Sequence, residues 1–408
     1  MKRIYSIIFA IMGIYLGSCN DKPTDLAINL LPDTVLTKGI SSYDTILIPA
    51  MRVYKAKFPL FNLGTLFIGK ANGISAISLS NFANLPDTLG YVTEDKIEVA
   101  QLTIYPRRYA LGDTNNSNLA FDIYRVNRAW TPDTTTYDSL MLSPANYFGE
   151  KIASYQGSIQ LKDTLDEITF DLPKNLIADW LKTEQVYDST KKEYVAKRIT
   201  NWGLAFVPTS SSNVINSFAG SKIGATKLSK IYIRYKNQQD STKLLNLEAG
   251  VDVAFIDVPK PAEDDIVLWN GINYWTELSF DISMIPKLSG IHKAQLDLFL
   301  DESKSFHANN KLDSIIEGNY FRDPTKESTF QYIAAGDSTG RFRFNSLTSS
   351  FQVWNKYDGK GTIVFMPHST TNQANELDKL VFYGLNAADT TKRPQLKIIY
   401  SLNPANFK

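Results

Sequence analysis

The sequence predicts an all-β protein made of two tandem jelly-roll-like β-sandwiches with one short helix each. Apolar and polar residues alternate with a period of two in many short segments, the pattern of half-buried strands. The 22 Phe, 21 Tyr and 6 Trp residues favour pleated sheets. Four sequence blocks recur in the same order in the two halves of the chain, and helical periodicity is seen in only two short segments.

The predicted strands are the segments with the clearest alternation. Residues 99–105 and 119–126 place apolar side chains at every second position. Asn270 and Gly271 lie between two further apolar segments, and an Asn-Gly pair accepts the positive φ angles of a tight hairpin turn. The other predicted strands are residues 168–170, 203–207, 231–235, 267–269, 272–275, 296–300, 363–366 and 396–400.

One short helix is predicted in each half. Residues 171–173 form an N-cap region with a proline in the first turn, and apolar side chains then recur at helical spacing as far as Trp180. In the second half, Leu347, Phe351 and Trp354 follow one another at i, i+4 and i+7. Both helices are therefore expected to pack a tryptophan into a core.

An internal repeat sets the expected domain boundaries. The chain has 408 residues, which is more than one hydrophobic core usually serves. The repeated blocks are residues 100–105 and 294–299, 170–180 and 344–354, 201–210 and 361–369, and 230–235 and 395–400. The repeat predicts a first domain at 40–238, a polar linker at 239–249, a second domain at 250–402 and a tail at 403–408.

The N-terminus has the pattern of a bacterial export signal. Lys2 and Arg3 precede the apolar residues 4–16, and Leu16-Gly17-Ser18-Cys19 resembles a lipobox, in which the cysteine is acylated before cleavage. We expect a signal peptide at 1–18, lipidation of Cys19 and a tether at 19–39. A transmembrane anchor is the alternative, but the apolar segment is shorter than the roughly 20 residues that cross a bilayer. The lipid is then the sole membrane attachment, at the outer membrane or cell surface.

The repeated blocks resemble a known family. Phe170-Asp171, Trp180 and Asn201-Trp202-Gly203-Leu204, together with Arg393-Pro394 before the last strand, resemble the DNRLRE-type domain. The resemblance implies β-sandwich modules of secreted and surface proteins, some of which bind polysaccharide, and it implies no catalytic residues. The second copy departs from the pattern at Asn345. The lipobox and residues 30–33 and 45–49 are similar to Bacteroidetes surface lipoproteins.

Composition excludes several classes of function. With 43 basic and 42 acidic residues, the chain has no basic excess for nucleic acid. Cys19 is the only cysteine, and the histidines, His292, His307 and His368, lack the spacing of helical zinc motifs. No nucleophile elbow, phosphate loop or dinucleotide fingerprint is present. We therefore predict a non-enzymatic surface protein that binds polysaccharide or a surface protein.

Two alternatives remain open. A polysaccharide hydrolase or lyase would need two carboxylates across a cleft, for which Asp264-Asp265 and Glu376 with Asp378 are candidates. The alternative interpretation is that these acidic residues are ordinary solvent-exposed surface residues. His368 and Ser369 are neighbours, but adjacent residues of a strand point to opposite faces. The second alternative is a structural component of an outer-membrane assembly.

Four aromatic residues are candidates for ligand binding. Trp130 follows a strand and enters a loop beside Arg128, which is typical of sugar-binding platforms. The alternative interpretation is that Trp130 folds back and caps the sandwich. Trp269, Tyr274 and Trp275 cluster at the predicted hairpin and are expected to be exposed.

A weak calcium site is the one candidate cofactor site. Asp113, Asn115 and Ser117 supply oxygen-bearing side chains at alternate positions, which calcium favours. Tyr124 stands where an EF-hand would need a bidentate Glu, and a plain hairpin loop explains the composition equally well. No other metal or cofactor is expected.

The lipobox generates the first testable prediction. A Cys19→Ala variant should yield an uncleaved or unanchored product, because the thiol is the acyl acceptor and the sequence contains no other anchor. Metabolic labelling with a palmitate analogue measures this directly. Labelling that persists in the variant would contradict the assignment of Cys19.

Overall fold

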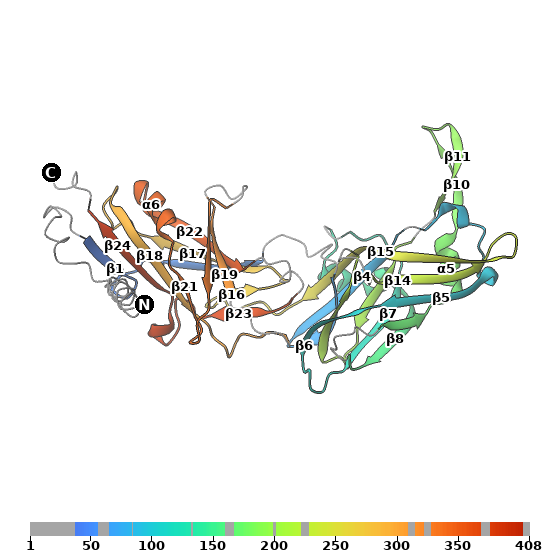
Figure 1. Cartoon of the computed structure of the whole chain (residues 1–408), viewed down its shortest axis with the longest axis horizontal. Coiled ribbons are helices and arrows are strands. Elements are labelled where there is room, and N and C mark those ends of the chain that lie inside the picture. The colour runs from blue at the N-terminus through green and yellow to red at the C-terminus, as the bar shows by residue number, and fades with distance from the viewer. Residues whose placement is uncertain are drawn as a thin grey trace, which may run out of the picture.

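The computed structural model is mostly β, as the sequence predicts, and its sheets are antiparallel. Two halves lie side by side in Figure 1. The first half comprises residues 65–257, and the second half comprises residues 37–55 together with 258–402. The structure describes residues 37–55, 65–83, 85–131, 134–159, 167–198, 201–221, 228–308, 315–321, 328–368 and 376–402.

The first half is built on an eleven-stranded sheet within the described residues. Its main path is β6-β13-β3-β4-β15-β14-β5-β9, while β12 pairs with both β4 and β7, and β8 pairs with β7. The elements are β3 (Thr65–Ala71), β4 (Ile74–Phe82), η1 (Asp87–Leu89), η2 (Glu94–Lys96), β5 (Ile97–Ile104), β6 (Pro106–Gly112), β7 (Leu119–Val126), α3 (Tyr137–Leu142), α4 (Pro144–Tyr147), β8 (Phe148–Gly157), β9 (Ile168–Asp171), α5 (Lys174–Leu181), β10 (Thr183–Asp188), β11 (Glu193–Arg198), β12 (Leu204–Pro208), β13 (Val214–Ala219), β14 (Lys230–Lys236) and β15 (Thr242–Asp257).

The second half contains a four-stranded and a seven-stranded sheet within the described residues. Their orders are β1-β24-β18-β21 and β20-β19-β22-β17-β16-β23, with β2 also paired to β17. The elements are β1 (Thr37–Ser41), β2 (Ala50–Lys55), β16 (Ile266–Trp269), β17 (Tyr274–Asp281), β18 (Gly290–Phe299), β19 (Ile315–Tyr320), β20 (Phe330–Ala335), β21 (Arg341–Phe344), α6 (Thr348–Lys356), β22 (Lys360–Pro367), β23 (Lys379–Phe382), η4 (Thr390–Lys392) and β24 (Gln395–Ser401).

The strand pairings of the two halves correspond. The path β14-β5-β9 has its counterpart in β24-β18-β21, and in each case the last strand is followed by a helix, α5 or α6. In the first half, β15 pairs with β14 and then with β4. In the second half, β1 pairs with β24 and β2 pairs with β17. Residues 37–55 therefore take the place in the second half that β15 takes in the first.

This arrangement corrects the expected boundaries. Residues 40–55, predicted to belong to the first domain, pair instead with β24 and β17. The predicted linker 239–249 lies largely within β15, where Thr242 pairs with Lys236. The polar residues at its start belong to the exposed hairpin between β14 and β15. Polar side chains are compatible with a strand there, because one face of the strand is solvated. The tether as far as residue 36 and the tail 403–408 lie outside the described residues.

Each half buries its own apolar core, and each helix contributes a tryptophan. Trp180 of α5 is 1% exposed and stacks on Phe82 with ring centroids 6.3 Å apart. Trp354 of α6 is 3% exposed and stacks on Phe280 at 5.7 Å. The predicted role of both helices agrees with this packing. The first half also contains α3 and α4, so the expectation of one helix in each half is wrong there.

A third apolar cluster joins the halves at a junction. Phe67 and Tyr109 of the first half pack with Trp269 and Leu377 of the second. The Tyr109 hydroxyl donates to Asp378 Oδ1 at 3.2 Å and accepts from the Leu377 N–H at 2.7 Å. Burial, and then the charge of Asp378, raise the pKa of Tyr109 well above its ordinary value. The phenol stays neutral at physiological pH and remains a donor across the junction.

The strand pairings generate a second prediction. Residues 250–402 alone should fold poorly, because they lack β1, β2 and the core residues Leu47 and Ile48, which are 0% and 7% exposed. Fusing residues 37–55 to that fragment should restore a cooperative thermal transition followed by circular dichroism. Identical melting of the two fragments would contradict a structural role for residues 37–55.

The tryptophan packing generates a third prediction. Trp180→Ala and Trp354→Ala should each lower the free energy of unfolding by about 3–5 kcal/mol, the usual loss on truncating a large buried aromatic residue. The matched control is Tyr194→Ala, since Tyr194 is 70% exposed, and its effect should stay within about 0.5 kcal/mol. Denaturant titrations measure all three. Near-wild-type stability of both tryptophan variants would refute the packing role.

Candidate functional site

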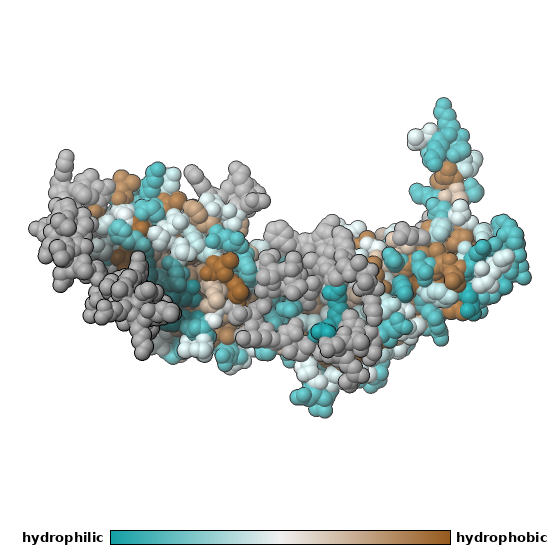
Figure 2. Space-filling model, in the orientation of Figure 1, coloured by the Kyte–Doolittle hydropathy of each residue, from teal (hydrophilic) through white to brown (hydrophobic). Residues whose placement is uncertain are grey.

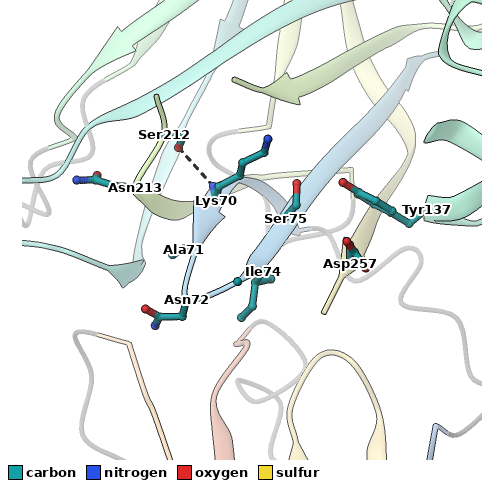
Figure 3. Close-up of a pocket in the computed structure, with 10 residues that line it drawn as sticks. Lys70, Ala71, Asn72, Ile74, Ser75, Tyr137, Ser212, Asn213 and Asp257 are labelled. Atoms are coloured by element: carbon teal, nitrogen blue, oxygen red, sulfur yellow. Dashed lines mark hydrogen bonds between the residues drawn. The ribbon is translucent and has the colours of Figure 1, made fainter. Parts of the chain in front are cut away.

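An open cleft of about 530 Å³ lies at the end of the first half nearest the junction (Figure 3). Its position follows from the β3–β4 turn, where Ala71 and Ile74 belong to the junction cluster. Strands β3, β4 and β15, helix α3 and the loop before β13 all contribute to the cleft. The lining residues are Lys70, Ala71, Asn72, Gly73, Ile74, Ser75, Tyr137, Ser212, Asn213 and Asp257.

A row of three polar residues crosses the floor of the cleft. Lys70 is paired with Ser75 across β3 and β4, and Ser75 is paired with Asp257 across β4 and β15. Directly opposed residues of antiparallel strands place their side chains on the same face of the sheet. Adjacent strands lie about 4.8 Å apart, so the Lys70 and Asp257 backbones are separated by roughly 10 Å. The row therefore carries a positive group at one end and a negative group at the other.

The charged ends of this row are available to a ligand. Within the described residues, neither Lys70 nor Asp257 forms an ion pair with another side chain. The Ser75 hydroxyl between them is buried and has no hydrogen-bond partner in the described part of the chain. A polar group without a partner is costly in a protein interior.

Tyr137 supplies the aromatic wall of the cleft. It is the first residue of α3, whose start is held by a capping box between Thr136 and Ser139. Figure 3 shows the Tyr137 hydroxyl directed toward the Ser75 side of the cleft, with Asp257 beside the ring. The ring is half-buried, so it offers apolar surface next to polar groups.

The rim is formed by two asparagines on tight loops. Asn72 and Gly73 adopt φ angles of 51° and 76°, which the turn between β3 and β4 requires. The Lys70 N–H donates to Ser212 Oγ at 3.3 Å, and this hydroxyl donates to the Val214 carbonyl at 3.0 Å. These bonds hold the Asn213 loop against β3. Asn72 and Asn213 are both exposed. The Asn213 amide nitrogen donates to the Asn116 carbonyl at 2.9 Å, and its oxygen accepts from the Asn118 N–H at 2.8 Å.

The described lining of the cleft combines a few polar groups with one aromatic ring. Its charged side chains are one ammonium and one carboxylate, and the other polar groups are hydroxyls and amides. In the described residues, no group of three or more His, Cys, Asp and Glu side chains is placed to hold a metal ion. Sequence reasoning missed this cleft, although Asn72-Gly73 is the same type of turn signal as Asn270-Gly271.

Trp130, a predicted platform residue, packs back onto the first half. Its indole Nε1–H donates to the Trp202 carbonyl at 2.8 Å. The ring is half-buried against a cluster that includes Val126 and Leu140. This is the geometry of the capping interpretation.

The three aromatic residues at the predicted hairpin separate in the structure. Trp269 is 1% exposed, and its indole donates to the Leu377 carbonyl at 3.0 Å. The expectation of an exposed Trp269 is therefore wrong, because the junction covers it. Tyr274 is half-buried against the same cluster. Trp275 is also half-buried and lies edge-on to Tyr54, with ring centroids 6.4 Å apart.

The calcium candidate lies on the loop between β6 and β7. Asp113 Oδ1 accepts hydrogen bonds from the N–H groups of Asn115 and Asn116 at 3.1 and 3.0 Å. Ser117 Oγ lies 2.6 Å from Ser158 Oγ. These bonds are those of an ordinary turn, and a calcium site here stays a prediction.

The acidic candidates for an enzyme site form structural contacts. Asp265 accepts two hydrogen bonds from Lys304 Nζ, at 2.9 and 2.8 Å. Asp378 lies in the junction and also accepts from the Ala308 N–H at 3.1 Å. His368 Nδ1 lies 3.0 Å from Glu317 Oε2. Ser369 lies outside the described residues.

The N-terminal features also lie beyond the described part of the chain. Residues 1–18 and Cys19 precede Thr37, the first described residue. Within the described ranges, no helix has the length and apolar character needed to cross a membrane.

Comparisons with known proteins add little. No protein-family model matches the chain, and no curated protein matches it. A structure of the Macrobrachium rosenbergii nodavirus aligns over 91% of this chain and 91% of its own, with 10% sequence identity and a TM-score of 0.15. This similarity is too low to bear on the fold or the function.

Proposed function

We propose that the protein is a non-catalytic, lipid-anchored surface protein of the outer membrane that binds a neutral glycan in the cleft between Lys70 and Asp257. Its two halves are proposed to be jelly-roll-like sandwiches. The observation that carries the proposal is the row Lys70–Ser75–Asp257, which lies on the floor of an open cleft. A surface protein remains the alternative partner, and nucleic acid is not expected.

The polar groups of the cleft match the chemistry of sugar hydroxyls. A carboxylate accepts hydrogen bonds from hydroxyl groups, while ammonium and amide groups donate to them. Lys70 and Asp257 offset each other in charge, which favours a ligand without net charge. The half-buried ring of Tyr137 offers apolar surface for a sugar face.

The number of carboxylates supports a binding role. Among the described residues that line the cleft, Asp257 is the one carboxylate. Glycoside hydrolysis generally uses two carboxyl groups about 5–9.5 Å apart. The described lining residues therefore offer no pair of this kind.

A glycan array tests the proposal and gives the fourth prediction. The chain beginning at Asn20 should bind neutral polysaccharide, and Asp257→Asn and Tyr137→Ala should each weaken binding at least tenfold, or about 1.4 kcal/mol. Matched controls are Asp44→Asn and Tyr194→Ala, whose side chains are exposed away from the cleft. Full glycan binding by the Asp257→Asn, Tyr137→Ala double variant would refute the proposed site. Absence of glycan binding by the unaltered chain would refute the proposed function.

A further inference from the structure

Three loops meet at the end of the second half that lies farthest from the junction. Strand β17 begins at Tyr274 beside the junction and ends at Asp281. The Asp281 N–H donates to the Leu47 carbonyl at 3.0 Å, and the Ile282 N–H donates to the Gly359 carbonyl at 2.8 Å. We call residues 45–48, 282–289 and 356–360 the terminal face.

The terminal face exposes large apolar side chains from all three loops. A soluble protein normally shows such side chains singly, and a concentration of them marks an interaction site. The backbone of the 282–289 loop is fixed in place, because the Asn355 side-chain amide donates to the carbonyls of Ile285 and Pro286 at 3.3 and 3.1 Å. The residues and their exposed fractions are Ile46, 78%; Met284, 53%; Leu288, 58%; and Tyr357, 52%.

The chain from the N-terminus reaches the fold at the same end. Thr37 is paired with Ser401, and Ser401 is paired with Gly290, which directly follows the 282–289 loop. Residues 20–36 connect Cys19 to Thr37 and, whatever their conformation, extend at most about 60 Å. A lipid on Cys19 would therefore keep the end of the fold where Thr37 lies within about 60 Å of the bilayer.

The charged residues of the face are suited to lipid headgroups. The face contains the exposed residues Lys287, Lys356 and Lys360, against one carboxylate, Asp358. Lys360 Nζ lies 3.5 Å from the neighbouring Asp281. Lysines beside exposed apolar residues and a tyrosine are typical of segments that lie in a membrane interface.

We propose that the terminal face rests on the lipid bilayer, with Ile46, Met284 and Leu288 in the interface and the lysines at the headgroups. This inference rests on the lipid anchor of the proposed function. The anchor holds the face at a high effective concentration near the membrane, so weak contacts suffice. The face combines exposed apolar side chains with three lysines, a composition that favours lipid over a protein partner.

The consequence is a fixed orientation of the molecule. The first half lies beyond the junction, on the other side of the second half from the terminal face (Figure 1). The β10–β11 ribbon projects sideways from the first half (Figure 1), and Figure 2 shows hydrophilic residues at its tip. The cleft is then held away from the bilayer by the length of the second half.

An environment-sensitive fluorophore tests this orientation. The chain beginning at Asn20 retains every described residue and contains no cysteine, so one introduced cysteine is labelled uniquely. Leu288→Cys carries the probe, and Tyr194→Cys on the β10–β11 ribbon is the matched control. An N-terminal hexahistidine segment holds each protein on phosphatidylethanolamine–phosphatidylglycerol vesicles that contain nickel-chelating lipid. Nitrobenzoxadiazole fluorescence should rise at least twofold and shift to the blue at position 288, but not at position 194.

Other outcomes overturn the proposal. Equal responses at the two positions, or no response at 288, would show that the face does not reach the bilayer. A concentration-dependent response at 288 without vesicles would assign the face to a second copy of the chain. The hexahistidine segment attaches the protein to the vesicles without Cys19, so this experiment does not depend on lipidation. Lipidation itself is tested separately, by acyl labelling of the native chain.

Discussion

Backbone pairing of β2 with β17 and of β1 with β24 is the constraint on which the organisation of this protein depends. These pairings place residues 37–55 in the second half, although the next described strand along the chain, β3, belongs to the first. The first half is therefore an insertion between two parts of the second. The sheets of both halves are completed in the same way, by β15 in one and by β1 with β2 in the other.

The junction follows from this connectivity. The chain leaves the first half through β15, whose Ala254 and Ile256 pack into the cluster that joins the halves. Tyr109 adds two buried hydrogen bonds to the second half, with Asp378 and Leu377. Removal of one partner from such a group leaves the other without a hydrogen bond in a dry environment, which is costly. The halves are therefore held by directional contacts as well as by apolar packing.

The proposed binding cleft shares these structural elements. Strand β15 ends with Asp257 at the cleft floor, and the turn between β3 and β4 joins the cleft to the junction. A ligand in the cleft would thus contact segments whose positions depend on the packing of both halves. The proposed membrane-facing loops lie at the opposite end, so the two proposed contacts use surfaces that do not compete.

Local sequence patterns identified part of the secondary structure and missed other strands, among them β3, β4 and β13. Period-two alternation identified strands such as β5, β7 and β14, and helical spacing identified the buried faces of Trp180 and Trp354. These features depend on residues close together in the chain, where the side-chain periodicity is set by backbone geometry. Two of the repeated blocks lie in strands that pair alike, β14 with β5 and β24 with β18.

The sequence by itself determined the β-rich class, the strands with the clearest alternation and the two core tryptophans. The tertiary structure decided which half residues 37–55 complete, that Trp269 is covered by the junction, and that Lys70, Ser75 and Asp257 form one row. Lys70 and Asp257 are far apart in the chain. Neither belongs to a sequence motif that would predict which residue lies beside it in the fold. Alternation assigns a side chain to a face of its own strand, but the partner strand and its register are chosen by packing between distant segments.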